Sequence, residues 1–390
     1  MSRSHTSPSP FGRHAAPDAR TVNRVVGDIR HGLPVVVTPA SPEQAALVVL
    51  AAEGITPQAL DALGRLAGAA PRLLVTGRRA MVMGLIPPSS APDHNSPLAL
   101  LAGPEAPLDA AAIARLAAPG SEADRPGAQP DAFPWRTADK PVERAAVQVM
   151  KAARLLPAAV VAEVPSAAPA EWAAANSLLS VGADQALDYE PALARGLRQV
   201  GAARVPLKGA EETRVLAFRP ADGGIEHIAL VIGQPGADGQ PVLTRLHSEC
   251  FTGDLLGSLR CDCGDQLRGA IEAIAEAGSG VLLYLAQEGR GIGLVNKLRA
   301  YELQDMGYDT LDANEQLGFD DDERIYLPAA EILARLGISR VRLMTNNPAK
   351  LRALARHGVE VTERVPHVFE ASCHARSYLH TKATRSGHLF

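Results

Sequence analysis

The stretch that decides this fold is Arg245-Leu-His-Ser-Glu-Cys-Phe-Thr-Gly-Asp-Leu-Leu-Gly-Ser-Leu-Arg-Cys-Asp-Cys-Gly-Asp-Gln266. It contains three of the four cysteines of the chain, Cys250, Cys261 and Cys263. Three thiolates suit Zn²⁺, and a set of three leaves one corner of a tetrahedron open for water, as in catalytic zinc sites. The spacing therefore predicts one catalytic zinc ion per chain.

Other readings of this stretch are weaker. The remaining cysteine, Cys373, lies far downstream, and His247 stands on a strand-like segment, where its side chain would point away from Cys250. A disulfide between Cys261 and Cys263 would need a geometry that such close neighbours do not easily reach. Three ordinary free cysteines remain the alternative to a metal site.

The composition indicates a globular protein long enough for two domains. The chain has 390 residues, of which 46% are hydrophobic and 21% charged, so each half can bury a core of its own. A net charge of −4, without a basic run, gives no reason to expect nucleic acid. Clustered thiols favour a reducing compartment. Because we find neither a secretory signal nor an apolar run long enough for a membrane span, we expect a cytoplasmic protein.

We predict an α/β fold with mixed sheets, divided into two domains. Residues 1–20 are rich in Ser, Pro and Arg and are expected to form a disordered tail. The first domain covers 21–197 and the second 202–390. In the first, we expect strands at 33–38, 72–76 and 158–164, helices at 43–53 and 142–150, a helix capped by Thr56 with Pro57 at its first position, and a loop-rich segment from 87 to 140.

The second half reads as strands that alternate with helices. We expect strands at 214–218, 225–232, 242–246, 281–285 and 341–345. The helix after the cysteines places Leu267, Ile271 and Ile274 on one face, as in a helix packed on a sheet. Another helix is expected to begin at Asn347 and Pro348.

Two segments look suited to an anion. Glu288-Gly-Arg-Gly-Ile-Gly293 combines a flexible backbone with a guanidinium, and Thr345 to Lys350 offers a helix N-terminus with a nearby lysine. Leu317-Gly-Phe-Asp-Asp-Asp-Glu-Arg324 would usually be a solvated loop. Close to a metal-activated water, however, its carboxylate can act as a base and its arginine can stabilise phosphate.

These motifs together resemble GTP cyclohydrolase II. The resemblance spans about residues 202–390 and rests on several segments in order: His247-Ser-Glu-Cys-x-Thr-Gly-Asp, Arg260-Cys-Asp-Cys-Gly, Gln287-Glu-Gly-Arg-Gly-Ile-Gly-Leu, Asn296-Lys-x-Arg-Ala-Tyr301, Asp322-x-Arg324, Thr345-Asn-Asn-Pro and Lys382 to Leu389. It implies a homodimeric enzyme that opens the imidazole ring of GTP at C8, in the first step of riboflavin biosynthesis. Formate and pyrophosphate would be released, leaving 2,5-diamino-6-(5-phosphoribosylamino)pyrimidin-4-one.

The resemblance also implies a role for individual residues. Cys250, Cys261 and Cys263 match the zinc ligands, Asp322 the proton acceptor, Arg324 a proposed nucleophile on the α-phosphate, and Tyr301 a tyrosine near the reacting ring. Since the arginine pKa exceeds about 12, a phosphate-stabilising role for Arg324 is chemically easier. Mg²⁺ is expected with the triphosphate. The positions that match GTP contacts are Arg245, Leu246, His247, Ser248, Glu249, Gln266, Glu288, Gly289, Arg290, Thr310, Thr345 and Lys350. A departure from the family is Ala286, where many relatives carry arginine.

The first half resembles 3,4-dihydroxy-2-butanone 4-phosphate synthase in a more scattered way. Ile29-Arg-His-Gly-Leu-Pro-Val-Val-Val, Ala51-Ala-Glu-Gly-Ile-Thr-Pro and the run from Ala145 to Val161 follow that pattern. The acidic cluster that should hold Mg²⁺ after the first strand is reduced to Glu43, and Val142 stands where a metal-binding histidine is expected. One glutamate does not make a site for a hard cation, so we expect this domain to be inactive.

Two alternatives to GTP cyclohydrolase II remain open at this point. One is a paralogue with the same zinc site that acts on another purine or pyrimidine, as in pyrimidine breakdown. The other is a regulatory homologue without catalytic activity, which need not bind stoichiometric zinc.

Overall fold

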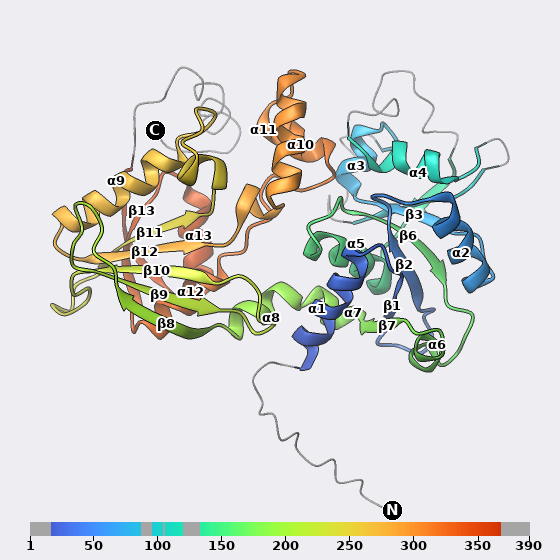
Figure 1. Ribbon diagram of the computed structural model, residues 1–390, viewed down its shortest axis with the longest axis horizontal. Coiled ribbons are helices and arrows are strands. Elements are labelled where there is room, and N and C mark those ends of the chain that lie inside the picture. Colours follow the sequence, from blue (N-terminus) through green and yellow to red (C-terminus); the bar gives the residue numbers. More distant parts are fainter. Residues whose placement is uncertain (1–16, 87–95, 104–105, 120–132, 368–390) are drawn as a thin grey trace, which may run out of the picture.

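The structure, a computed structural model, describes residues 17–86, 96–103, 106–119 and 133–367. Cys373 and the motif from Lys382 to Leu389 lie outside these ranges. Figure 1 shows two lobes, each built on one sheet, with α10 and α11 between them. Both sheets combine parallel and antiparallel pairs, which confirms the predicted α/β fold with mixed sheets.

The first sheet has the strand order β5-β4-β3-β6-β2-β1-β7 and is covered on both faces. Helices α1, α5 and α7 pack on one face, and α2 and α4 on the other. The strands and helices of this half are α1 (Pro17–Arg30), β1 (Val35–Thr38), β2 (Leu47–Ala51), α2 (Pro57–Ala67), β3 (Arg72–Val75), α3 (Gly77–Val82), β4 (Leu98–Leu100), α4 (Ala110–Ala117), β5 (Trp135–Thr137), α5 (Pro141–Ala152), β6 (Ala158–Glu163), α6 (Pro169–Ala175), β7 (Leu179–Gly182), α7 (Ala183–Leu187) and α8 (Tyr189–Arg195).

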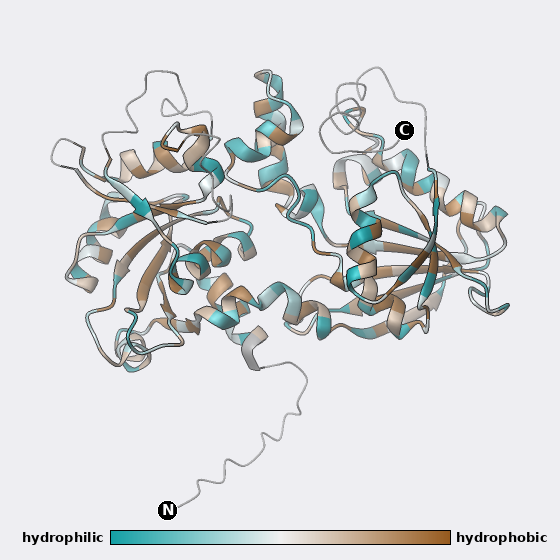
Figure 2. Cartoon of the chain, turned by 180° about the vertical axis from the view of Figure 1, so that it is seen from behind, coloured by the Kyte–Doolittle hydropathy of each residue, from teal (hydrophilic) through white to brown (hydrophobic). Residues whose placement is uncertain are grey.

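The second sheet has the order β14-β13-β11-β12-β10-β9-β8, with α9 on one face and α12 and α13 on the other. Figure 2 shows that apolar residues concentrate in the strands of both sheets. The elements of this half are β8 (Arg198–Arg204), β9 (Thr213–Arg219), β10 (His227–Ile232), β11 (Val242–Ser248), the π-helical turn η4 (Phe251–Leu255), α9 (Cys263–Glu276), β12 (Gly280–Leu285), the 3₁₀ turn η5 (Glu288–Gly291), α10 (Leu294–Asp305), α11 (Thr310–Gln316), α12 (Leu327–Arg335), β13 (Arg340–Met344), α13 (Pro348–Arg356) and β14 (Glu360–Val365).

Three expectations from the sequence need correction. The predicted helix at 43–53 is wrong, because Leu47–Ala51 forms β2, which is buried at every position between β1 and β6. Helix α1 begins at Pro17, so the last residues of the predicted tail at 1–20 are helical, while residues 1–16 lie outside the described ranges. Strand β8 already pairs within the second sheet, so a domain start at 202 falls inside that strand.

Several helix starts follow from the local sequence as predicted. The Thr56 side chain accepts a hydrogen bond from the Ala59 amide, with Pro57 next in the chain. The Asn347 side chain accepts from the Ala349 amide in the same way, with Pro348 at the first position of α13.

No described helix combines the length and the apolarity that a membrane crossing requires.

One buried arginine joins the two halves. Arg79, on α3, is 2% exposed, and its guanidinium donates to the carbonyls of Leu116, Ala118 and Gln316. The first two carbonyls lie at the end of α4 in the first half, and the third ends α11 in the second. A guanidinium therefore caps the C-termini of two helices at once, where a cation also interacts favourably with both helix dipoles.

We predict that Arg79→Met lowers the free energy of unfolding by about 2–4 kcal/mol, because buried carbonyls lose their donors. Thermal unfolding of the full chain measures the effect, with Arg65→Met on the exposed face of α2 as the control. If the two variants unfold at the same temperature, Arg79 does not join the halves as described.

Candidate active site

The candidate site lies at one edge of the second sheet. Strand β11 pairs in parallel with both β12 and β13, so the carboxyl ends of the three strands meet at this edge. Each strand continues into one of the segments singled out from the sequence: Ser248–Cys250, Gln287–Arg290 and Thr345–Asn347. In open α/β sheets, ligands bind outside the carboxyl ends of parallel strands.

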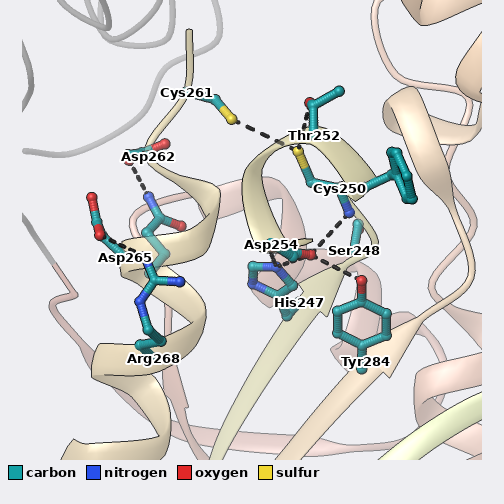
Figure 3. A network of polar contacts seen from close by, with 12 residues as sticks. His247, Ser248, Cys250, Thr252, Asp254, Cys261, Asp262, Asp265, Arg268 and Tyr284 are labelled. Carbon is teal, nitrogen blue, oxygen red and sulfur yellow. Dashed lines mark hydrogen bonds and ion pairs between the residues drawn. The ribbon is translucent and has the colours of Figure 1, made fainter. Parts of the chain in front are cut away.

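The three predicted zinc ligands come together at this edge. The Sγ atoms of Cys250, Cys261 and Cys263 lie within 4.8 Å of one another, and those of Cys250 and Cys261 are 3.7 Å apart. Figure 3 shows Cys250 after the end of β11 and Cys261 ahead of α9. All three are free thiols. No other group of three or more metal-binding side chains this close occurs in the described ranges.

Gly253 shows that the space beside the sulfurs must stay open. A Cβ atom at this position would lie 2.8 Å from the Cys261 Sγ and 2.9 Å from the Cys263 Cβ, closer than real Cβ atoms approach. Three soft ligands around a space that only glycine leaves free fit a zinc ion with one open coordination position.

A buried network that the sequence did not predict supports Cys250. Asp254 accepts hydrogen bonds from the Cys250 amide at 3.0 Å and from the Tyr284 hydroxyl at 2.9 Å, and its carboxylate lies 3.0 Å from the His247 Nε2 (Figure 3). Burial lowers the pKa of His247 despite the carboxylate beside it. Because the Nε2 of His247 contacts Asp254, this nitrogen already has a hydrogen-bond partner within the protein. The π-helical turn η4 brings Asp254 back to the Cys250 amide, and sequence spacing alone does not reveal such a turn.

A cavity of about 110 Å³ adjoins the cysteines. The predicted site residues on its wall are Ser248, Glu249, Glu288, Gly289, Arg290, Tyr301, Thr310, Arg324 and the three cysteines. Its wall carries two carboxylates, Glu249 and Glu288, together with the cations Lys297, Arg260, Arg290 and Arg324, which suits a ligand with both a polar ring and an anionic group.

Lys297, on α10, also lines this cavity, and its role was missed in the sequence. Its Nζ donates to the Glu288 Oε1 at 2.8 Å and to the Cys250 Sγ at 3.1 Å. Although burial opposes the charge, Glu288 and the Cys250 sulfur raise the pKa of Lys297, so it remains an ammonium. Glu288 in turn accepts from the Phe251 amide at 2.6 Å. The available signal was the spacing of Lys297 and Tyr301, which places both on one face of a helix.

The glycine-rich turn has an unusual backbone. Gly289, Arg290 and Gly291 have φ values of 63°, 59° and 99°. Left-handed conformations are easy for glycine and costly for arginine, so Arg290 is held there by its surroundings. Its Nη1 donates to the Asp321 carbonyl at 3.2 Å, which joins this turn to the acidic segment.

Asp322 and Arg324 form a two-pronged pair. The Arg324 Nε donates to one oxygen of Asp322 at 2.7 Å and Nη2 to the other at 2.6 Å. Burial favours the neutral acid, but the guanidinium outweighs it and holds the pKa of Asp322 below its usual value. The Arg324 Nη1 lies 3.4 Å from the Ser248 hydroxyl, so the pair faces the end of β11.

The other predicted contacts lie outside the wall of this cavity. Arg245 is buried and donates to the Met344 carbonyl and to the Gln266 side chain, and burial lowers its pKa to about 10. Lys350 is buried too, and its Nζ donates to the Leu246 carbonyl at 2.8 Å. These contacts tie the ends of β11 and β13 together. The Thr345 hydroxyl accepts from the Asn347 amide.

Ala286 faces a different space. It lines a second cavity, of about 430 Å³, together with residues of the first half such as Arg30 and Tyr189. Its amide donates to the His227 Nδ1 at 3.0 Å. Position 286 therefore borders the contact between the two halves.

Comparisons with known proteins agree with this arrangement. The profile of the family described as GTP cyclohydrolase II matches residues 198–366. A GTP cyclohydrolase-2 from Azospirillum brasilense is 54% identical over 373 residues, which span 95% of this chain and 94% of that protein. One from Pseudomonas paraeruginosa is 57% identical over 190 residues, 49% of this chain and 92% of that protein.

Among solved structures, a two-domain 3,4-dihydroxy-2-butanone 4-phosphate synthase from A. baumannii aligns with 90% of this chain and 99% of its own, at 16% identity and a TM-score of 0.36. Since so low a score carries no structural argument, the assignment rests on the sequence relatives. The resemblance inferred from the motifs of the second half is thereby confirmed, and the chain belongs to the GTP cyclohydrolase II family of hydrolases.

Proposed function

We propose that this chain is a zinc-dependent GTP cyclohydrolase II. It hydrolyses GTP to 2,5-diamino-6-(5-phosphoribosylamino)pyrimidin-4-one with release of formate and pyrophosphate, as the first step of riboflavin biosynthesis. The observation that carries the proposal is the shared location of two features. The trio of sulfurs opens onto the same cavity as Arg290 and Arg324, so a purine ring and its phosphates can be held together.

One zinc ion per chain is held by Cys250, Cys261 and Cys263, and Mg²⁺ accompanies the triphosphate. When bound, the zinc ion supplies a Lewis acid that makes water a better nucleophile near neutral pH. Lys297 keeps a positive charge against the Cys250 sulfur and positions Glu288 at the same time. Asp254 fixes the backbone of Cys250 from the other side.

The remaining residues bind and orient the nucleotide. Glu249 and Gln266 offer oxygen and amide groups that can pair with the guanine edge. The main phosphate contacts come from Arg290 and Arg324, which suit bidentate binding. The other GTP contacts are expected from Arg245, Leu246, His247, Ser248, Glu288, Gly289, Thr310, Thr345 and Lys350.

Asp322 acts as proton acceptor and Tyr301 stands beside the reacting ring. Both oxygens of Asp322 accept from Arg324. When Arg324 turns to a phosphate, Asp322 loses the charge that lowers its pKa and becomes a stronger base. This exchange gives Arg324 a stabilising role and does not require a nucleophilic guanidinium.

We also propose that the first half has no synthase activity, since Glu43 is the one acidic residue left in the segment that should bind Mg²⁺. The three free thiols suit the reducing cytoplasm. A homodimer that binds neither nucleic acid nor membrane completes the proposal.

The substrate is tested by incubating the full chain with zinc, Mg²⁺ and a single nucleotide. We expect formate and pyrophosphate in equal amounts from GTP, and neither product from ATP or UTP. Release from a pyrimidine nucleotide instead would favour the paralogue, and no release from any nucleotide by zinc-loaded protein would favour a non-catalytic homologue.

Removal of one thiol tests whether the three cysteines bind the zinc ion. We predict that Cys261→Ser binds zinc at least about tenfold more weakly and loses formate release, because a hydroxyl is a poor substitute for a soft thiolate. Elemental analysis measures the zinc content, and Thr252→Ser, which keeps a hydroxyl beside Cys250, is the control. Stoichiometric zinc in the Cys261 variant would contradict a three-thiolate site.

The acid–base pair is tested by Asp322→Asn. We predict a loss of kcat of about 10²-fold or more with zinc content unchanged, because the amide cannot accept a proton. Arg324→Lys keeps the charge but loses the two-pronged geometry, so it should raise KM for GTP as well. A wild-type kcat in the Asp322 variant would show that another group accepts the proton.

A further inference from the structure

The first half contacts the catalytic segments of the second half directly. We propose that Lys151 and Arg154, at the end of α5, are positioning residues that hold the Arg290 turn and the Asp320–Arg324 loop in their working arrangement. This inference rests on the proposed function, because it concerns the residues assigned there to phosphate binding and proton transfer. It gives the first half a role in the reaction of the second.

Lys151 acts on the loop that carries Asp322. Its Nζ lies 2.6 Å from the Glu323 Oε1, and the two side chains are only 13% and 18% exposed. The same oxygen accepts from the Asp320 amide at 2.9 Å, which closes the loop on itself. An ion pair largely removed from water holds its geometry better than one on the surface, and breaking it leaves a carboxylate without its counter-ion.

Glu323 also connects this loop to the glycine-rich turn. Its amide donates to the Arg290 carbonyl at 3.1 Å. A Cβ atom on Gly291 would lie 3.0 Å from the Glu323 carbonyl carbon and oxygen, so the two backbones are in close contact. A shift of Glu323 therefore moves Asp322, Arg324 and the backbone that supports Arg290.

Arg154 holds the turn from the opposite side. Its Nη1 donates to the Gly291 carbonyl, and its own carbonyl accepts from the Asn296 side chain at 3.0 Å. A Cβ atom on Gly293 would lie 3.4 Å from the Arg154 side chain. The turn thus lies between Arg154 of the first half and Glu323 of the second.

Both sides of this contact are under backbone strain. Arg154 and Arg290 have φ values of 60° and 59°, and the described residues contain just one other non-glycine residue with positive φ, Ser177. Such conformations are costly for residues with a side chain and persist where the surrounding structure enforces them. For Arg290, the contacts of Arg154 with the Gly291 carbonyl and of the Glu323 amide with the Arg290 carbonyl hold the backbone in this conformation.

An ordinary ion pair between domains would affect stability alone. Positioning predicts a different result, because the zinc ligands and the guanine contacts do not depend on Lys151. The variant should bind zinc normally, but it should bind GTP more weakly and turn it over more slowly, because Asp322, Arg324 and the Arg290 turn are displaced.

The test compares Lys151→Met with Arg144→Met, whose side chain is exposed on the same helix. For Lys151→Met we expect kcat for formate release to fall about tenfold and KM for GTP to rise several-fold, because Arg290 and Arg324 contact the phosphates, with zinc content unchanged. Lys151→Arg should restore most of the rate. Glu323→Gln should match Lys151→Met, and the double variant should be no slower than either, since both remove one interaction.

Hydrogen exchange of the same proteins without nucleotide provides a readout that does not depend on turnover. Amides of the 318–325 segment should exchange faster in Lys151→Met than in wild type or Arg144→Met. An unchanged kcat, additive effects in the double variant, or unchanged exchange in 318–325 would overturn the inference. A wild-type chain that releases no formate from GTP would instead refute the proposed function, and exchange would still decide whether Lys151 orders the loop.

Discussion

The parallel alignment of β11 with β12 and β13 is the constraint on which the site depends. Because parallel strands end at the same edge, the residues that follow them meet there without any further arrangement of the chain. Cys250 follows one strand and Glu288 another, and the Glu288 carboxylate accepts from the Phe251 amide. The cysteine cluster and the turn that carries Arg290 are therefore neighbours because of sheet topology.

Buried cations keep this edge in place. Arg245 and Lys350 donate to backbone carbonyls at the ends of β13 and β11, and Lys297 bridges Glu288 and the Cys250 sulfur. Charges that lie this deep need specific partners, since their desolvation is repaid only in good geometry. Each of them fixes one strand end relative to the next. Groups held by such partners are preorganised, which favours catalysis.

Local chemistry explains which parts of this structure were accessible from the sequence. The starts of α2 at Thr56 and of α13 at Asn347 depend on neighbouring residues, so they could be predicted from the sequence. The short spacing of the cysteines likewise predicted that their sulfur atoms lie together. The helix predicted at 43–53 was wrong. The alanines around Leu47–Ala51 favour a helix, but this segment is buried between two strands and forms β2. Lys297 and Asp254 were missed for a related reason: their partners are set by tertiary folding and by the turn η4.

Among the described residues, the contacts between the halves do not involve the segment after β1, where we propose that synthase chemistry has been lost. The acidic residues expected of a synthase belong after β1, in the segment that retains only Glu43. The contacts with the second half include Glu53 after β2, Arg79 on α3, and Lys151 and Arg154 at and after the end of α5. Since the two sets of residues are on different elements, substitutions after β1 leave the interface intact. Loss of a metal site after β1, as we propose, is therefore compatible with an intact surface beside the Arg290 turn.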